Sequence, residues 1–452
     1  MTQFNIIKTT LGMQDKHIQI TSDDFTRVQD KHDRFHYEVE ACLTYYPTCC
    51  IKCGCVNPSK ADQKAKSINP ILHLHGTKIC RVKGAVANGV PVIINLKKQR
   101  YKCLECHQTF TAKTPDIASG KQISQSARCR IVSELTKSQS MKDIAEREGV
   151  SPSTVTRLAR QTARQLEPNF QHLPIALCFD EFASTKQADA GMSFVMMNGL
   201  THDILDVLPT RKLRALMIYF YRYPRHVRQR VKYITIDMNN AYKSLIQACF
   251  PNAEIILDRF HIVQHLNRAL NRHRIEVMKS CKKYRQGDYK KLKRYWKLLL
   301  KNSDDLDFDH YTYQPLFGGR LAEQRIVDYL LSLDSRLEET YRYINRLKQH
   351  ITDRDAEQFR ITLVESKHIQ LKHYVRTAFQ TLERFAEAID NALTYRLSNG
   401  PLEGMNHKIK LLKRTGYGYR NIWNLRARIL VMTRFARKPR PSKRLYFAEK
   451  AA

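Results

Sequence analysis

The sequence predicts a multidomain α+β protein with a cysteine-rich module, a short helical module, and a mixed five-stranded sheet interrupted by a long all-helical segment. Three observations lead to this prediction. Eight of the twelve cysteines lie between Cys42 and Cys106. Apolar runs of strand length follow from Leu173 onward, and residues 262–395 then show helical spacing almost throughout. A chain of 452 residues is long enough for several domains.

The composition is strongly basic. Lys and Arg number 77 against 43 Asp and Glu, a formal net charge of +34. Such a balance favours a polyanionic partner, most simply DNA or RNA. No apolar run approaches the roughly 18 residues that span a membrane, and the N-terminus has no signal-peptide pattern, so we expect a cytoplasmic protein.

The boundaries follow from changes in pattern along the chain. We expect an N-terminal segment at 1–40, a zinc-binding module at 41–115, helices at 125–168, the first part of the α/β core at 173–261, a helical insertion at 262–395, C-terminal core helices at 396–435 and a basic tail at 436–452.

Two CxxC pairs dominate the cysteine module. Cys50 and Cys53 form the first pair, and Cys103 and Cys106 form the second. Four thiolates on two tight turns suit one tetrahedral structural zinc ion, in a zinc-ribbon-like fold closed by a hairpin around PVIINLKKQRYKC. Other residues could replace one ligand: Cys49, Cys55, Cys80, His73, His75 and His107. The alternative to a metal site is a set of reduced, buried cysteines.

The stretch SMKDIAEREGVSPSTVTRLARQ predicts a helix-turn-helix. A turn at Gly149 separates two short helices, and Ser151 caps the second helix with Pro152 at its first position. Polar residues suited to base edges and phosphates point outward from this second helix: Ser153, Thr154, Thr156, Arg157 and Arg160. The alternative is an ordinary helical hairpin in a core, which would not need so polar a face.

Five apolar segments after Leu173 predict the sheet. They are IALCFDEFAS, SFVMMNGL, DILDVLPT, VKYITIDM and AEIILD, with helical stretches between the later ones. Three consecutive strands followed by alternating helix and strand indicate a mixed sheet with helices on its faces.

Two carboxylates end predicted strands. Asp180 ends the first and Asp237 ends the fourth, which makes them candidate ligands for Mg²⁺, and Glu403 on a later helix would complete the set. Two such ions can activate an attacking oxygen and stabilise a leaving oxygen in phosphodiester chemistry. Taken singly, each Asp is more simply a turn acid or a helix cap, and it is their arrangement together with the cysteine and helix-turn-helix modules upstream that favours metal binding. Glu181, Asp203 and Asp206 compete for these roles, although their positions fit a solvated strand or turn better.

The stretch SNGPLEGMNHKIKLLKR predicts an amphipathic helix. Its stripe of Leu402, Met405, Ile409 and Leu412 is expected to dock on the sheet. Glu403, Asn406 and Lys410 share another face, because seven residues span almost two turns.

These segments together resemble bacterial insertion-sequence transposases of the DDE class, specifically the ISL-three family. The resemblance covers nearly the whole chain and is most specific in ITIDMNNAYKSLIQACFPNAEIILDRFHIVQHLN and SNGPLEGMNHKIKLLKRTGYGYRN. It implies an RNase H-like core interrupted by an all-helical insertion, with Asp180, Asp237 and Glu403 as the catalytic triad. DRFH has an Asp-x2-His spacing that resembles a motif of several related transposase groups, which would place Asp258 and His261 near the active site; the alternative is a helix-start Asp and a structural His. Because Asn406 and Lys410 share a face with Glu403, we expect them to meet DNA beside the metal ions.

The resemblance further implies an enzyme that binds the terminal inverted repeats of its element, cleaves DNA and joins the 3′-hydroxyls to target DNA, using Mg²⁺ or Mn²⁺. Because two ends must be brought together, a homodimer or higher oligomer is expected, associated with the nucleoid. Two alternatives stay open: a non-catalytic DNA-binding regulator derived from a transposase, and a metal-dependent nuclease without strand transfer.

Overall fold

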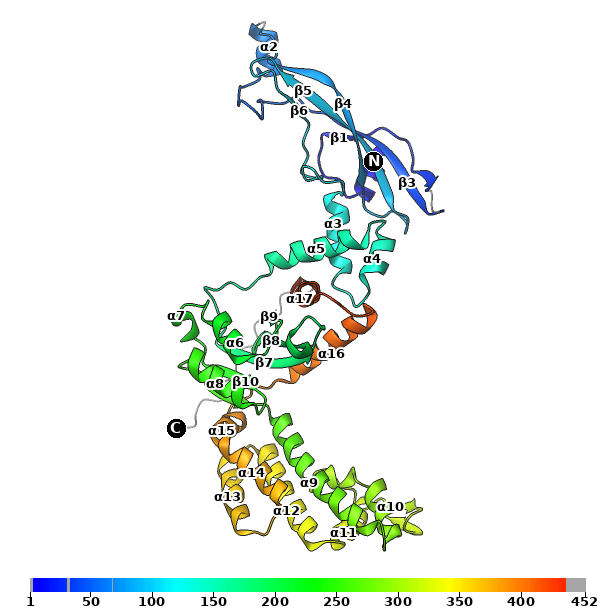
Figure 1. Cartoon of the computed structure of the whole chain (residues 1–452). Coiled ribbons are helices and arrows are strands. Elements are labelled where there is room, and N and C mark those ends of the chain that lie inside the picture. Colours follow the sequence, from blue (N-terminus) through cyan, green and yellow to red (C-terminus); the bar gives the residue numbers. More distant parts are fainter. Residues whose placement is uncertain (1–2, 31–32, 67, 436–452) are drawn as a thin grey trace. The chain divides into compact units, whose positions relative to one another are not determined.

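The computed structural model describes residues 3–30, 33–66 and 68–435 (Figure 1). The predicted basic tail, 436–452, lies outside the described residues. The described chain forms two compact units, and they are treated separately below. Residues 3–167 together with 408–435 form the N-terminal unit, and residues 168–407 form the core unit. Among the described helices, none is long and apolar enough to cross a membrane.

A six-stranded sheet forms much of the N-terminal unit. Its elements are α1 (Gln3–Thr10), β1 (Ile18–Ile20), β2 (Thr26–Gln29), β3 (Phe35–Leu43), α2 (Lys60–Lys66), β4 (Leu72–Lys83), β5 (Val92–Cys103) and β6 (Thr109–Thr111). The strand order is β1-β3-β5-β4, with β2 also pairing with β3 and β6 with β5. Val92, Ile94 and Leu96 of β5 are buried in alternation, and Tyr101 and Cys103 near its end are buried in the same core.

The predicted hairpin around residues 91–103 is present, because β4 and β5 pair antiparallel. The predicted boundary between 40 and 41 does not separate two structures. Strand β3 crosses it and pairs in parallel with β5, from Tyr37 opposite Val92 to Leu43 opposite Lys98. The N-terminal segment therefore belongs to the same sheet as the cysteine module.

Three helices follow the sheet, as the sequence predicts: α3 (Gln125–Glu134), α4 (Met141–Arg147) and α5 (Pro152–Gln165). Ser140 forms a capping box with Asp143 at the start of α4, and Ser151 caps α5 by accepting from the Thr154 N–H. Gly149 has φ +59° in the turn between them, a conformation that favours glycine. Ile144, Ala145, Val155 and Leu158 are buried, and Val150 is half-buried.

The C-terminal helices do not group as predicted. Residues 396–435 were expected in the α/β core, but the division between the units falls within α16 (Gly400–Thr415). Residues 408–435, including α17 (Ile422–Leu430) and the short π-helix η5 (Val431–Phe435), belong to the N-terminal unit. The reason is long-range packing: α17 lies against α5, and the fully buried Arg428 donates to the carbonyls of Lys137 (2.7 Å) and Gln139 (3.1 Å).

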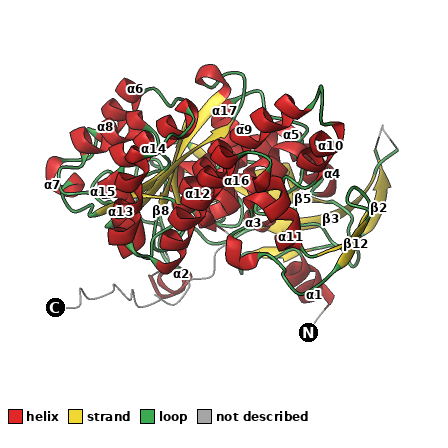
Figure 2. Ribbon diagram, turned by 90° about the horizontal axis from the view of Figure 1, so that it is seen from below, coloured by secondary structure: helices red, strands yellow, loops and turns green. Residues whose placement is uncertain are grey.

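The core unit contains the predicted mixed five-stranded sheet, ordered β11-β10-β7-β8-β9. Figure 2 colours strands yellow and helices red and labels β8 of this sheet. Strands β7, β8 and β9 pair antiparallel, whereas β10 and β11 run parallel to β7. The elements are β7 (Ala176–Ala183), η1 (Asp189–Gly191), β8 (Met192–Asn198), β9 (Ile204–Leu208), α6 (Leu213–Phe220), α7 (Arg225–Arg228), β10 (Tyr233–Ile236), α8 (Asn240–Cys249) and β11 (Glu254–Leu257). Central strands are buried on both faces, as expected where helices cover a sheet.

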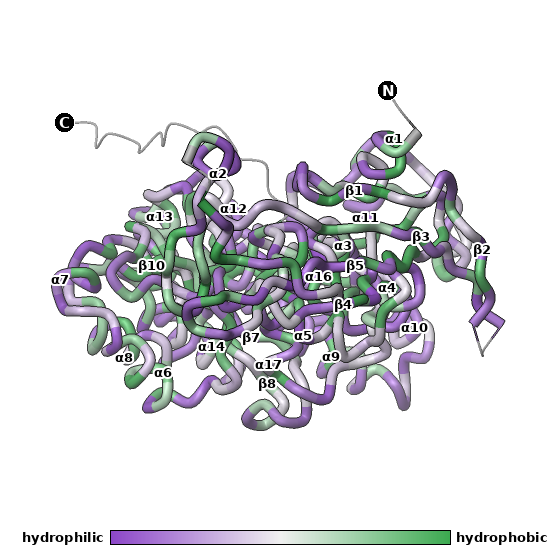
Figure 3. The backbone as a smooth tube through the Cα atoms, turned by 90° about the horizontal axis from the view of Figure 1, so that it is seen from above, coloured by the Kyte–Doolittle hydropathy of each residue, from purple (hydrophilic) through white to green (hydrophobic). Residues whose placement is uncertain are grey.

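A largely helical insertion follows β11. It contains α9 (Arg259–Cys281), α10 (Gln286–Arg294), η2 (Leu298–Leu300), η3 (Ser303–Asp305), α11 (Glu323–Ser332), α12 (Ser335–Asp353), α13 (Ala356–Glu365), η4 (Ser366–His368), α14 (His373–Arg384) and α15 (Ala386–Thr394). Its helices bury apolar stripes, and hydrophobic and hydrophilic segments alternate along the tube in Figure 3. The insertion is not all-helical as predicted, because β12 (Thr312–Gln314) and β13 (Gly319–Leu321) form a short hairpin across a glycine-containing turn.

Candidate active site

Two parallel strands place Asp180 and Asp237 side by side. Thr235 of β10 is the register partner of Cys178 of β7. Each aspartate lies two residues beyond its member of this pair, so both are at the same level and on the same face of neighbouring strands. Such strands lie only about 4.8 Å apart. The local sequence thus delivers two carboxylates to one edge of the sheet.

The first turns of α16 are attached to β7 beside these carboxylates. The buried Asn399 donates from Nδ2 to the Phe179 carbonyl (3.1 Å), and its own carbonyl accepts from the Glu403 N–H (2.9 Å). One turn later, Asn406 donates from Nδ2 to Oδ2 of Asp180 (2.7 Å). The helix therefore brings Glu403 and Asn406 to the strand that carries Asp180.

His261 lies at the centre of the acidic cluster. Its Nε2 is 2.8 Å from Oδ1 of Asp237, 3.6 Å from Oε1 of Glu403 and 4.0 Å from Oδ2 of Asp258. Asp258 follows β11 directly and His261 lies in the first turn of α9, so the Asp-x2-His spacing puts both at the sheet edge. The structure thus brings together Asp180, Asp237, Asp258, His261 and Glu403.

Burial and neighbouring charges shift the pKa values of the residues in this cluster. Burial raises the pKa of Asp180 to about 6, and the negative charges of Asp237 and Glu403 contribute to this rise. The backbone N–H of Glu181 and the charge of His261 act in the opposite direction and lower this pKa. Burial likewise raises the pKa of Asp258. The hydrogen bond to Asp237 raises the pKa of His261. Carboxylates this crowded favour a bound cation or proton over a set of free charges.

The donor atoms fit a divalent metal ion. Oδ2 of Asp258 and Oδ1 of Asn406 are buried without a hydrogen-bond partner in the described structure. Hard carboxylate oxygens suit Mg²⁺ or Mn²⁺. Among the described residues, the ligand atoms that all lie within 4.8 Å of one another belong to Asp258, His261 and Glu403, rather than to Asp180, Asp237 and Glu403 together. The three predicted acids therefore do not form one such set, and His261 contacts both Asp237 and Glu403.

An open pocket of about 590 Å³ leads to Asp180 and Asp237. Glu181 also lines it, but its carboxylate is held by Arg211 (2.7 Å) and by the Tyr242 hydroxyl (2.7 Å). These two contacts explain the position of the Glu181 carboxylate without a role in metal binding.

The other competing acids lie elsewhere. Asp203 accepts from the Thr201 hydroxyl (2.6 Å) in a turn. Asp206 is not in the solvated position expected for it, because it is buried and accepts from the Tyr219 hydroxyl (2.8 Å). Lys410 is exposed on α16, two turns beyond Glu403.

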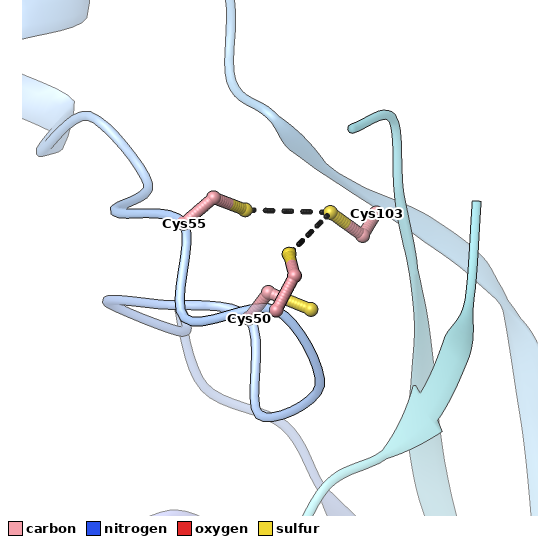
Figure 4. Close-up of side chains that lie close together, drawn as sticks. Cys50, Cys55 and Cys103 are labelled. Carbon is pink, nitrogen blue, oxygen red and sulfur yellow. Dashed lines mark hydrogen bonds between the residues drawn. The ribbon is translucent and has the colours of Figure 1, made fainter. Parts of the chain in front are cut away.

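Five cysteine sulfurs lie near one another in the N-terminal unit. Figure 4 labels three of these residues, Cys50, Cys55 and Cys103. Sulfur–sulfur distances are 3.8 Å for Cys50–Cys106, 3.8 Å for Cys53–Cys103 and 3.4 Å for Cys55–Cys103. The four sulfurs that all lie within 4.8 Å of one another belong to Cys50, Cys53, Cys55 and Cys103. The structure thus places Cys55, one of the alternative ligands, in the set where the sequence favoured Cys106.

The two CxxC turns have matching backbones. The residue after each second cysteine has positive φ: +76° at Gly54 and +55° at His107. Backbone N–H groups of Cys106 and Glu105 hold the pKa of the Cys103 thiol near 6, although burial opposes them. Burial and the neighbouring Cys103 raise the pKa of Cys55 to about 12. These sulfurs can all become thiolates once a cation such as Zn²⁺ compensates their charge.

The five predicted DNA-binding residues of α5 differ in their surroundings. Ser153, Arg157 and Arg160 are exposed, and Thr154 and Thr156 are half-buried. Arg160 donates from Nε to Oδ1 of Asn424 (2.6 Å) on α17, and Thr156 bonds back to the Pro152 carbonyl. Sequence patterns gave no signal for Asn424, because its contact joins residues 264 positions apart.

Comparison with known proteins defines the class. Residues 177–429, more than half of the chain, match the family model of ISL-three DDE transposases, which is described as "Transposase". The chain therefore belongs to the ISL-three family of transposases. It is 25% identical over 358 residues to the transposase for insertion sequence element IS1001 of Bordetella parapertussis, covering 77% of this chain and 83% of that protein.

A second relative, from Lactococcus lactis subsp. lactis, carries the name ATP-dependent protease. It is 36% identical over 113 residues, which are 25% of this chain and 36% of that protein. So short a match carries no conclusion about the activity of this chain.

Proposed function

We propose that the chain is a catalytically competent insertion-sequence transposase that cuts the ends of its element and joins them to target DNA. The observation that carries this proposal is the register of β7 and β10, which puts Asp180 and Asp237 at one sheet edge with Glu403 nearby. The sheet order and its interruption before α16 support an RNase H-like interpretation of the core unit.

In this proposal Asp180, Asp237 and Glu403 hold Mg²⁺ or Mn²⁺ ions, two in the complete site. Bound there, the ions would activate the attacking water or 3′-hydroxyl and stabilise the leaving oxygen. Asn406 orients the Asp180 carboxylate through its 2.7 Å hydrogen bond. His261 orients Asp237 through its Nε2, 2.8 Å from Oδ1, and this hydrogen bond raises the pKa of His261 while no metal ion is bound.

The N-terminal unit would recognise the terminal inverted repeats. We interpret α4 and α5 as a DNA-binding helix-turn-helix whose second helix presents Ser153, Thr154 and Arg157 to the major groove. One structural zinc ion would hold the two cysteine turns together, with three shared ligands (Cys50, Cys53 and Cys103) and either Cys55 or Cys106 as the fourth. A homodimer or larger assembly would bring two ends together, in the nucleoid of the cytoplasm. Lys410 would contact DNA next to the metal ligands.

The test is incubation of the full chain with a duplex that contains an element end, in Mg²⁺ or Mn²⁺. We expect nicked and strand-transferred products from the wild type and none from Glu403→Gln. Unchanged cleavage by Glu403→Gln would show that the triad is wrong. Binding without cleavage under either metal would favour a non-catalytic regulator, and cleavage without joined products would favour a nuclease.

A further inference from the structure

The sheet and the helices of the N-terminal unit are joined at the turn before α5. Lys83, the last residue of β4, donates from Nζ to the Gly149 carbonyl. A Cβ at Gly149 would lie 2.5 Å from Cβ of Pro91, so the turn packs directly on the loop between β4 and β5. The backbone of Lys83 also pairs with Gln122 (2.8 Å) and Ser124 (2.9 Å), which fixes the segment before α3. Sheet and helices therefore present one continuous surface.

A basic groove of about 760 Å³ lies on this surface, between the end of β4, the segment before α3 and the polar side of α5. Its lining includes five cationic side chains and no carboxylate: Arg81, Lys83, Lys121, Arg128 and Arg157. A neighbouring cavity of about 1080 Å³ shares Arg81 and Lys83, but Asp30, Glu38, Glu146 and Glu148 line it as well. The absence of acids thus distinguishes the basic groove from the cavity next to it.

Three of the five cations are uncompensated. Arg81 pairs with Glu38, and Lys83 is engaged by Gly149. Within the described part of the chain, Lys121, Arg128 and Arg157 form no ion pair with a carboxylate. Burial lowers the pKa of Lys83, the charges of Arg34 and Arg81 lower it further, and the charge of Asp30 opposes them. A polyanion would relieve this repulsion.

We infer that the basic groove binds the sugar-phosphate backbone of duplex DNA, so that the sheet and α5 hold one duplex together. This inference rests on the proposed function. Thr154 and Gln161 of α5 also line the groove, so a phosphate strand lying in it would run alongside the proposed recognition helix. Contacts of this kind fix the position of the protein on DNA without reading sequence. The zinc-binding sheet then contributes directly to affinity through Lys83, and Lys121 and Arg128 add phosphate contacts that the helix-turn-helix pattern does not contain.

The experiment compares a groove variant, Lys121→Gln with Arg128→Gln, against a control variant, Lys16→Gln with Lys64→Gln. The control removes two exposed cations of the same unit that do not line the groove. Full-length proteins are titrated with inverted-repeat duplex, random duplex and single-stranded RNA at several salt concentrations. For the groove variant we expect the slope of log affinity against log salt to fall by about 1.8 on both duplexes, roughly 0.9 for each lost phosphate contact. The preference for inverted-repeat over random duplex should not change.

A charge-conserving pair, Lys121→Arg with Arg128→Lys, should retain the wild-type slope, which separates lost charge from damage to the fold. If the groove variant matched wild type and control on duplex DNA, the inference would be overturned while the proposed function survived. A change confined to single-stranded RNA would overturn it too. If the wild type bound neither duplex, both the inference and the proposed function would fail.

Discussion

The hydrogen bond between Asn406 and Asp180 gives the sharpest prediction about the candidate active site. Asn406 is 9% exposed, and its Nδ2 lies 2.7 Å from Oδ2 of Asp180, a carboxylate whose pKa is already raised to about 6 by burial and neighbouring acids. A hydrogen bond to a charged group is worth about 1.5–3 kcal/mol, and loss of such an orienting partner typically weakens metal affinity about 10- to 100-fold. We therefore expect Asn406→Ala to need about 10- to 100-fold more Mg²⁺ for half-maximal end cleavage.

The assay is cleavage of an end-containing duplex at a series of Mg²⁺ concentrations, with DNA binding measured in the absence of metal. Asn406→Asp should be worse than Asn406→Ala, because it adds a negative charge beside Asp180. Asn252→Ala is the matched control: it removes an exposed amide that donates to the Gln229 carbonyl (3.1 Å) in the same unit. If Asn406→Ala cleaved normally at wild-type Mg²⁺ concentrations, the assignment of Asp180 as a metal ligand oriented by Asn406 would be wrong.

Three further predictions concern the cysteine cluster, the turn before α5 and a buried lysine. Cys55→Ser and Cys106→Ser should each retain one zinc ion by metal analysis, whereas the double variant should lose it. Loss of zinc from one single variant would identify that cysteine as the sole fourth ligand and contradict the proposal that either cysteine can serve. Gly149→Ala should destabilise the protein by about 1–3 kcal/mol more than Gly89→Ala in chemical denaturation, because both residues have positive φ but only the first Cβ would meet a neighbouring side chain; equal losses would refute this packing. Burial lowers the pKa of Lys348 from 10.5 to about 8, so the unfolded chain binds more protons between these pH values and stability should rise with pH there, by at most about 3 kcal/mol. Lys348→Met should remove this rise in denaturation curves at pH 8 to 10.5. An unchanged rise would mean that Lys348 is not the group that causes it.

Local signals account for what the sequence predicted well. The five strands of the core sheet were predicted from apolar runs, and the start of α5 from Ser151 and Pro152, whose capping effect needs no distant partner. The Asp-x2-His spacing predicted that His261 lies near the acids, but not that it lies between Asp237 and Glu403.

The features that were missed depend on contacts between distant segments. Nothing near Arg428 shows that its guanidinium will be buried against the carbonyls of Lys137 and Gln139, about 290 residues earlier. The contribution of Cys55 was left open for a similar reason: spacing distinguishes CxxC pairs, whereas the position of a fifth sulfur depends on how the two turns meet.

The return of residues 408–435 to the N-terminal unit limits how this transposase can be re-engineered. Its N-terminal unit is not one continuous segment, because α17 and Arg428 come from the far end of the chain. A fragment that stops at 167 would lack the donor to the loop between α3 and α4. Exchange of end specificity between related elements would therefore require both segments to be transplanted together, and the second graft would begin in the helix that also carries Glu403.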